Sequence, residues 1–288
     1  MTTDKRTEDL APEAVQQGNQ AWWTENTMSY DWHGELTMPR FSREWFDAID
    51  GRFIHASRLG ATDTRPFDRV LPYDRLAGAR VLEIGCGMGL HTELMTRAGA
   101  RVTAIDLSPT SVEATRRRLE LRGLSAEVKQ ADAERLPFDD ASFDLVWSWG
   151  VIHHSARTGR VVRQIARVLR PEGEARVMVY NRAGMSAHVV FWRDFVFRAA
   201  FLRKSFEEML YESTDGFSAR YYHKEQFEDL FRAFFRDVRC EVQGQEPDAV
   251  PLPRRLRRLV APLVSFERKR ALQARYGSFL FLTAKNPE

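Results

Sequence analysis

The sequence predicts a doubly wound α/β fold built on a mostly parallel sheet. From residue 80 to about residue 181, short apolar segments of strand length alternate with longer segments of helical pattern. Val81, Leu82 and Ile84 give the first strand the nearly continuous apolar character of a strand covered on both faces. Three glycines follow at alternate positions, so this strand runs directly into a turn that can approach a ligand.

The elements can be assigned in chain order from this alternation. We expect strands at 80–84, 101–105, 126–130, 143–149 and 174–180, with helices at 89–98, 109–122, 157–169 and 223–235. Ser108 and Pro109 form a helix-start signal for the second of these helices. Two more strands, at about 236–243 and 277–284, complete a predicted sheet of seven strands.

Three segments lie outside this alternation. We expect residues 1–79 to form a helical, aromatic-rich lid, and residues 80–288 to form one domain. That domain carries an inserted lid at about 182–222 and a basic helix at about 253–275. Ligands of open α/β sheets bind beyond the carboxyl ends of the strands, so these additions are expected to form the substrate pocket.

The glycine turn distinguishes between two classes of cofactor. Gly85, Gly87 and Gly89 follow Glu83 in the pattern E-x-G-x-G-x-G. A dinucleotide fingerprint, G-x-G-x-x-G, would need glycine at position 90, where Leu90 stands. The pattern therefore favours S-adenosylmethionine over NAD.

Acidic residues follow the next two strands. Asp106 comes at the end of the second strand, at a spacing that suits bidentate recognition of ribose hydroxyls. Asp132 follows the third strand, where a carboxylate can accept a hydrogen bond from an adenine amino group. Alone, Asp106 could cap a helix and Asp132 could be a solvated loop residue. Together with Glu83 they place acids at three successive strands, which favours a cofactor site.

Residues 80 to about 181 resemble the core of the class I S-adenosylmethionine-dependent methyltransferases, in the small-molecule branch that includes the ubiquinone and menaquinone enzymes. The resemblance rests on VLEIGCGMG, AIDLSPTSVEATRRRL, ADAERLPFDDASFDLVWSWGVIHH and IARVLRPEGEARVMVY. It departs from the family pattern at Gln164, where glutamate is frequent, and at Glu172, where a glycine is usual. The family implies a Rossmann-like sheet with an antiparallel hairpin at one edge.

The resemblance also implies roles for individual residues. The amino-acid portion of the cofactor would contact Glu83, Gly85, Cys86, Gly87 and Gly89. The ribose would be held by Asp106 with Leu107, the adenine would be framed by Asp132 and Ala133, and Trp149 would lie beside the cofactor.

Composition is that of a mildly basic globular protein. The 288 residues have 43% hydrophobic content and a net charge of +3, and no apolar run is long enough to span a membrane. The first residues lack the apolar stretch of a signal peptide, so a cytoplasmic location is expected. Two cysteines, Cys86 and Cys240, suggest neither a disulfide framework nor a metal site.

The basic stretch near the C-terminus has two interpretations. Its arginines alternate with apolar residues, so it could dock on phosphates or on an anionic membrane surface. Alternatively, it forms an amphipathic helix with a packed apolar side and solvated arginines. No nucleic-acid-binding module accompanies it, so a small molecule is the expected partner, and the oligomeric state is left open.

Candidate substrate residues lie in the additions and at the last parallel strand. Tyr30 and Trp32 are the candidates from an N-terminal region otherwise expected to pack two helices. Tyr180 ends the fifth strand, and His188 opens an aromatic insertion that could line an apolar cavity. The expected acceptor is therefore an apolar or aromatic small molecule.

His153 and His154 follow the fourth strand and are the candidate catalytic residues. If the acceptor is a hydroxyl or a protonated amine, a base must remove its proton, and we favour His154 by analogy with the family. The alternative is a histidine that orients the pocket loop without titrating. Three functions are compatible with the sequence: a small-molecule methyltransferase of secondary metabolism or cofactor biosynthesis, an RNA or protein methyltransferase, and a relative that binds S-adenosylmethionine without methyl transfer.

Overall fold

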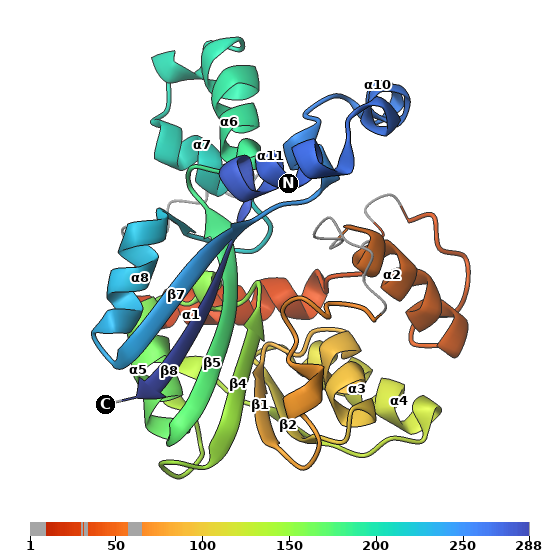
Figure 1. Ribbon diagram of the computed structural model, residues 1–288, viewed down its shortest axis with the longest axis vertical. Helices are drawn as coiled ribbons and strands as arrows, with labels where there is room; N and C mark the ends of the chain where they lie inside the picture. Colours follow the sequence, from red (N-terminus) through yellow and green to blue (C-terminus); the bar gives the residue numbers. More distant parts are fainter. Residues whose placement is uncertain (1–9, 30, 32–33, 57–64, 288) are drawn as a thin grey trace.

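A single sheet forms the centre of the molecule (Figure 1). The computed structural model describes residues 10–29, 31, 34–56 and 65–287, and in them the sheet has eight strands. Seven follow the order β3-β2-β1-β4-β5-β8-β7, and the two-residue strand β6 pairs with β5. The order reverses between β1 and β4, which is the arrangement of a doubly wound fold and the place where such folds bind ligands.

The five predicted parallel strands are confirmed. They are β1 Arg80–Ile84, β2 Arg101–Asp106, β3 Glu127–Gln130, β4 Phe143–Trp149 and β5 Leu169–Asn181. The antiparallel edge is confirmed as well: β8 (Phe279–Pro287) runs antiparallel to both β5 and β7 (Phe235–Gln243). The sequence did not predict β6 (Tyr221–Tyr222), since two residues are too few for a periodic pattern.

Helices cover both faces of the sheet. They include α3 Leu90–Arg97, α4 Pro109–Arg122, α5 Thr158–Val168 and α8 Lys224–Arg232. Neighbouring residues of β1 serve opposite cores because strand side chains alternate: Val81 packs in the core that holds Leu119 of α4, and Leu82 packs in the core that holds Ile165 of α5. The predicted start of α4 at Pro109 is confirmed, and Ser108 caps the helix by accepting a hydrogen bond from the Ser111 backbone N–H.

The additions form smaller helices around this core. The N-terminal region holds α1 Pro12–Glu25, α2 Arg43–Ala56 and the 3₁₀ turn η1 Tyr73–Arg75. The insertion after β5 forms α6 Met185–Val190, the π-helical turn η4 Phe191–Val196, the 3₁₀ turn η5 Ala200–Leu202 and α7 Phe206–Glu212. Short α9 (Glu246–Ala249) follows β7. None of the helices in the described ranges is long and apolar enough to cross a membrane.

The basic segment forms two helices instead of the single helix predicted at 253–275. Helix α10 (Arg254–Val260) continues into the 3₁₀ turn η6 (Ala261–Leu263), and α11 spans Phe266–Tyr276. The chain leaves helical geometry at Val264, and Ser265 caps α11 by accepting a hydrogen bond from the Arg268 backbone N–H. The break at Val264 therefore separates α10 and η6, which are rich in apolar residues and arginine, from α11, which has its own N-cap.

Candidate active site

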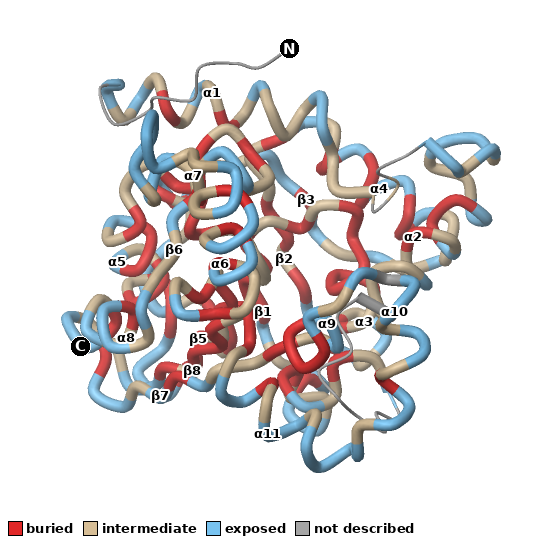
Figure 2. The backbone as a smooth tube through the Cα atoms, turned by 90° about the horizontal axis from the view of Figure 1, so that it is seen from above, coloured by how far each residue is buried: buried red, intermediate tan, exposed pale blue. Residues whose placement is uncertain are grey.

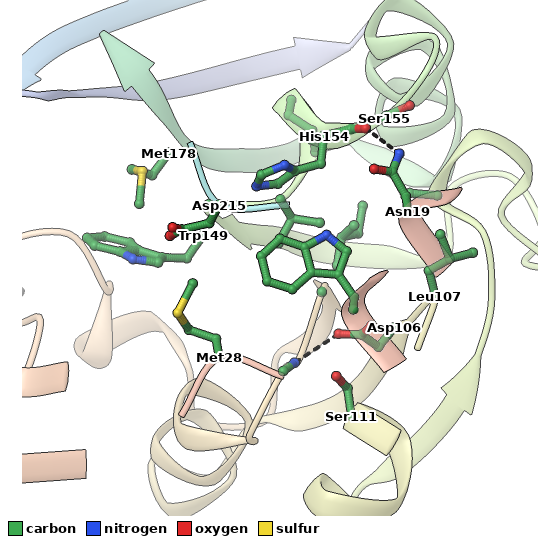
Figure 3. Close-up of a pocket in the computed structure, with 18 of the residues that line it drawn as sticks. Asn19, Met28, Asp106, Leu107, Ser111, Trp149, His154, Ser155, Met178 and Asp215 are labelled. Carbon is green, nitrogen blue, oxygen red and sulfur yellow. Dashed lines mark hydrogen bonds between the residues drawn. The ribbon is translucent and has the colours of Figure 1, made fainter. Parts of the chain in front are cut away.

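A cavity of about 440 Å³ lies at the carboxyl ends of the parallel strands (Figure 3). Strands on both sides of the reversal contribute to it: Gly85 and Gly87 after β1, Asp106 at the end of β2, Trp149 at the end of β4, and Tyr180 of β5. The volume lies in the range of small-molecule sites. The sheet therefore brings segments distant in sequence to one pocket, at the position the fold class predicts.

The two glycines of the loop that line the cavity have different surroundings: Gly85 packs closely against Val151, whereas Gly87 faces open space. Gly85 has φ +79°, and a Cβ there would overlap the side chain of Val151. Gly87 has φ +52°, and no atom of the described residues lies within 4 Å of the position of its missing Cβ. Glycine at 87 therefore leaves free space beside a cavity-lining backbone, as a ligand that approaches the main chain requires.

Asp106 connects the glycine loop to β2. Its Oδ2 accepts a hydrogen bond from the Gly87 N–H at 2.9 Å, and its Oδ1 accepts one from the Ser108 N–H at 2.9 Å. Burial raises the pKa of this carboxyl, while these backbone donors oppose the rise. A carboxylate can accept about four hydrogen bonds, and the residue lines the cavity, so a hydroxyl group of a ligand can still bind to it.

Asp132 lies at the cavity wall and also contacts α1. Its Oδ1 accepts from the Glu134 N–H at 2.9 Å and from Nε2 of Gln16 at 2.9 Å. The Gln16 side-chain oxygen in turn accepts from the Ala156 N–H at 3.1 Å. Gln16 thus joins the first helix to the loops that follow β3 and β4.

Helix α1 forms one wall of the cavity, through Gln16, Asn19 and Trp23. The Asn19 side-chain amide donates to the backbone oxygen of His154 at 2.6 Å, and the Trp23 ring packs edge-on against the His154 ring, with centroids 5.1 Å apart. The backbone oxygen of Trp23 accepts from the Ser108 hydroxyl at 3.1 Å. The sequence indicated an aromatic N-terminal cover but not these residues, because contacts across more than a hundred positions leave no local pattern.

Three residues expected at the cofactor lie behind the loop, outside the cavity lining: Glu83, Cys86 and Gly89. Glu83 is 1% exposed and accepts a hydrogen bond from the Thr92 hydroxyl of α3. Burial raises its pKa to about 8. The buried Cys86 accepts a hydrogen bond from the Thr115 hydroxyl at 3.3 Å, and Gly89 begins α3 with φ +81°. Glu83 and Cys86 instead join the loop to α3 and α4 through Thr92 and Thr115.

The two candidate catalytic histidines have different environments. The His154 ring reaches the cavity, and its Nδ1 lies 2.6 Å from the Ser218 carbonyl oxygen (Figure 3). Because a carbonyl only accepts hydrogen bonds, Nδ1 carries the proton, and Nε2 is the basic nitrogen of the neutral ring. His153 is fully buried, and among the described residues neither of its ring nitrogens has a hydrogen-bond partner. Burial holds its pKa well below the usual range. His153 therefore lies outside the cavity as a neutral packing residue.

The other predicted pocket residues have mixed outcomes. The cavity is lined by four of them: Leu107, Ala133, Trp149 and Tyr180. The ring centroids of Tyr180 and His153 lie 4.3 Å apart. His188 does not reach the cavity: the residue is exposed on α6, and its Nδ1 lies 2.9 Å from the Gly184 oxygen. It was predicted there because the aromatic insertion that it opens could line an apolar cavity. Tyr30 and Trp32 lie outside the described residues.

The remaining wall is mostly apolar. It includes Met28, Phe53, Met178 and Phe279, and Figure 3 shows Met28 and Met178 near Trp149. Asp215, from the loop before β6, adds a carboxylate that reaches the cavity beside His154 and Trp149. Sequence reasoning missed Asp215, since a single acid in a Ser-Thr-Asp-Gly turn carries no functional pattern.

Comparison with known proteins gives matches centred on the same segment. Residues 82–177 match the model of a methyltransferase domain family. The chain is 39% identical over 126 residues to a ubiquinone biosynthesis O-methyltransferase of Methylocella silvestris, covering 44% of this chain and 49% of that protein. It is 40% identical over 140 residues to the 27-O-demethylrifamycin SV methyltransferase of Amycolatopsis mediterranei, covering 46% and 52%. The matched region thus spans about half the length of these relatives.

Solved structures share the fold at low sequence identity. The [4+2]-cyclase SpnF aligns with a TM-score of 0.50 and 22% identity, over 79% of this chain and 83% of that chain. A complex of the Haloferax volcanii Trm112 methyltransferase activator with a putative methyltransferase gives 0.51 and 18%, over 84% and 92%. Both confirm the α/β architecture. Residues 82–177, which carry the glycine loop and Asp106, are thus the part of this chain that is similar to methyltransferases.

Proposed function

We propose that this protein transfers a methyl group from S-adenosylmethionine to an oxygen, nitrogen or carbon atom of an apolar or aromatic small molecule. The observation that carries the proposal is the composition of one cavity, in which the glycine loop, Asp106 and Asp132 meet an apolar wall and the His154 ring. The relatives named above are small-molecule methyltransferases, which supports the same class of acceptor.

The residues present fit this cofactor. Gly87 leaves open space at the cavity wall, which suits close approach of the amino-acid portion. Asp106 offers its remaining lone pairs to ribose hydroxyls, and Asp132 with Ala133 offers a carboxylate and a backbone edge to the adenine. When bound, the cofactor would supply a methyl group attached to a positively charged sulfonium. The sulfur leaves as a neutral thioether when the methyl group is transferred. The protein must then mainly align the acceptor, with reacting atoms about 3–3.5 Å apart.

His154 is the proposed general base for an acceptor that must lose a proton. The Ser218 carbonyl fixes the proton on Nδ1, which leaves Nε2 able to take a proton from an acceptor hydroxyl or amine. Tyr180 and Asp215 reach the same cavity and can position the acceptor through their polar atoms. A purely orienting role for His154 is the competing interpretation, and its kinetics differ, as described in the Discussion.

The cover formed by α1 supports a small acceptor over a polymer. The helix is joined to Asp132, His154 and Ser108 by hydrogen bonds, so RNA or a folded protein would have to displace it to reach the cavity. A cytoplasmic location, a preference for small molecules over nucleic acid and a place in secondary metabolism or cofactor biosynthesis stay predictions.

The proposal can be tested by methyl transfer itself. Purified protein is incubated with methyl-labelled S-adenosylmethionine and a panel of phenols, hydroxyquinones and aromatic amines, and the products are identified by mass spectrometry. We expect a methylated small molecule together with S-adenosylhomocysteine. Cofactor binding without any methylated product would favour a relative that binds S-adenosylmethionine for another purpose, and label incorporated only into RNA or protein would contradict the small-molecule assignment.

A further inference from the structure

A row of exposed apolar side chains runs along α10 and the start of α11. Leu256 is 52% exposed, Leu259 71%, Leu263 83% and Phe266 48%, and we call these four residues the apolar ridge. The first three are spaced by three and four positions, which places them on one side of a helix. The segment also has a packed apolar side: Ala261 is buried with Ala249 and Val250, and Val260 and Val264 pack against them. The apolar ridge is a second set of apolar residues, which this packing leaves exposed.

The ridge lies within the most basic part of the chain. Residues 254–270 contain seven Lys or Arg and one Glu, whereas the whole chain has a net charge of only +3, so the rest of the chain is acidic on balance. Arg257 lies 3.9 Å from Glu246. Arg255, Arg258, Arg268 and Arg270 are exposed and have no carboxylate within ion-pair distance in the part of the chain that the structure describes.

A second apolar projection follows α6. Trp192 is 52% exposed, Phe197 79%, Phe201 53% and Leu202 74%, and we call these four residues the aromatic tip. A neighbouring set of aromatic residues packs together behind it: the ring centroids of Phe191 and Phe195 lie 5.6 Å apart, and each contacts Phe206. The tip is thus presented by an internally packed aromatic cluster, with Arg203 and Lys204 directly after it.

The ridge and the tip project from neighbouring elements at one end of the molecule. Helix α9 contacts both α6 and α11, and Figure 1 draws α6 and α10 at the end where β5 leads into α6. In Figure 2, the molecule is seen from above, and parts of α6, α10 and α11 are coloured as exposed. The cavity lies at the carboxyl ends of the strands, so this is also the end nearest the active site.

We propose that the apolar ridge and the aromatic tip together form a docking face for an anionic lipid bilayer. Exposed Leu, Phe and Trp side chains can enter the boundary between headgroups and acyl chains, while adjacent arginines bind anionic headgroups. Both features occur together here: the ridge leucines are exposed, and Arg255 and Arg258 beside them have no acidic partner among the described residues.

A second copy of this chain is a poorer occupant for the same surface. A two-fold interface sets the same surface patch of both copies against each other, so the seven basic residues of segment 254–270 would be brought close to those of the partner. An anionic membrane removes this repulsion because it supplies the missing negative charge. The proposal does not rest on methyl transfer, since the face lies outside the cavity lining.

Vesicle binding of the full-length protein tests the proposal, with no cofactor or acceptor present. We expect the protein to sediment with vesicles of phosphatidylcholine and phosphatidylglycerol, and not with phosphatidylcholine alone. Binding should weaken as sodium chloride rises from about 0.05 to 0.5 M, because salt screens the arginines from the headgroups. No sedimentation with the anionic vesicles, or equal sedimentation with both, would overturn the proposal.

Paired variants separate the two parts of the face from general surface effects. Arg255→Glu with Arg258→Glu should reduce the bound fraction at least about tenfold, and Leu259→Ser with Leu263→Ser should do the same at unchanged net charge. The matched charge control, Arg101→Glu with Arg239→Glu, makes the same change in net charge elsewhere on the surface and should bind like wild type. If the control variant lost vesicle binding to the same degree, net charge alone would explain the loss. That result would overturn the assignment of this face.

Fluorescence tests the aromatic tip independently. Brominated lipids quench tryptophan side chains that reach the acyl region, so wild type should be quenched on anionic vesicles and Trp192→Phe should lose that part of the quenching. Circular dichroism of each variant checks the fold. If the ridge variants instead change the mass in solution while wild type ignores vesicles, the face joins two copies of the chain and the membrane proposal is wrong.

Discussion

Asp106 and Glu83 lie on neighbouring strands but have different roles, because they differ in whether their side chains reach the cavity. Asp106 lines the cavity and holds the Gly87 and Ser108 N–H groups, so it can both shape the glycine loop and bind a ligand. Glu83 lies under the loop and bonds to Thr92, away from the cavity. The sequence placed both acids correctly at strand ends. It could not separate their roles, because the direction of each side chain depends on how the loop folds over β1.

Glu83→Gln should change how stability depends on pH. Burial raises the pKa of Glu83 to about 8 from its ordinary 4.5, so the folded protein keeps a proton that the unfolded chain releases above about pH 5. This contribution to the unfolding free energy is complete at low pH and is lost as pH rises toward 8, by at most ~1.4 kcal/mol per pH unit. Glutamine stays neutral and removes the slope.

Urea unfolding of both proteins between pH 5 and about 8 measures this effect as a difference. Buried His91 and His153 titrate in both proteins, so their contributions cancel in the comparison. Wild type should lose stability relative to Glu83→Gln as pH rises. Parallel profiles would show that Glu83 is ionised in the folded protein.

His154→Ala should lower turnover by about 10² to 10⁴ with nearly unchanged cofactor affinity, if His154 is the general base. The loss should shrink at high pH for an acceptor that ionises unaided. The exposed His188→Ala, outside the cavity, is the matched control and should behave like wild type. Joint loss of melting temperature and cofactor affinity, with a modest rate effect and an unchanged pH profile, would identify an orienting residue instead.

At the scale of elements, helix α1 is the addition most closely tied to the site. Gln16 bridges Asp132 and the Ala156 N–H, and Asn19 binds the His154 backbone oxygen. These bonds join the first helix to loops more than a hundred residues away. The helix therefore forms a wall of the cavity. Its stability depends on its hydrogen bonds to the loops that carry Asp132 and His154.

Gln16→Ala should loosen this cover. Loss of the bridge removes about 1 kcal/mol, so the α1 amides should exchange hydrogen about fivefold faster than in wild type. Gln17→Ala is the matched control, since Gln17 is exposed on the same helix. Hydrogen exchange followed by mass spectrometry measures both variants. Equal exchange in the two would show that the helix is held by packing alone.

The predictable elements were those with their own periodic pattern. All five parallel strands and the antiparallel edge follow from apolar alternation and from the family resemblance, and α4 begins at the Ser108-Pro109 signal. The basic segment was predicted as one helix, with a packed apolar side and a docking role both left open. It forms two helices, in which Ala261 is buried while Leu259 and Leu263 are exposed, because local spacing does not say which apolar residues meet a partner surface.

At the scale of the whole molecule, this chain combines a core that is similar to other methyltransferases with segments that lie outside that similarity. The family match covers residues 82–177, which hold the glycine loop, the acids after β2 and β3, and the histidines after β4. The cover helix, Asp215 and the proposed docking face lie outside that match. The sequence therefore predicted cavity residues such as Gly87, Asp106 and Asp132, whereas α1 and Asp215 reach the cavity through contacts between segments that only the fold brings together.

The central claim is that the cavity binds S-adenosylmethionine through the glycine loop and Asp106. Calorimetric titration of S-adenosylhomocysteine into wild type and Asp106→Ala tests it most directly, with NADH as the competing ligand. We predict micromolar binding to wild type, about −8 kcal/mol, and a loss of about 1.5–3 kcal/mol in the variant, the value of hydrogen bonds to a charged group. Tight NADH binding with no heat from S-adenosylhomocysteine would contradict the account.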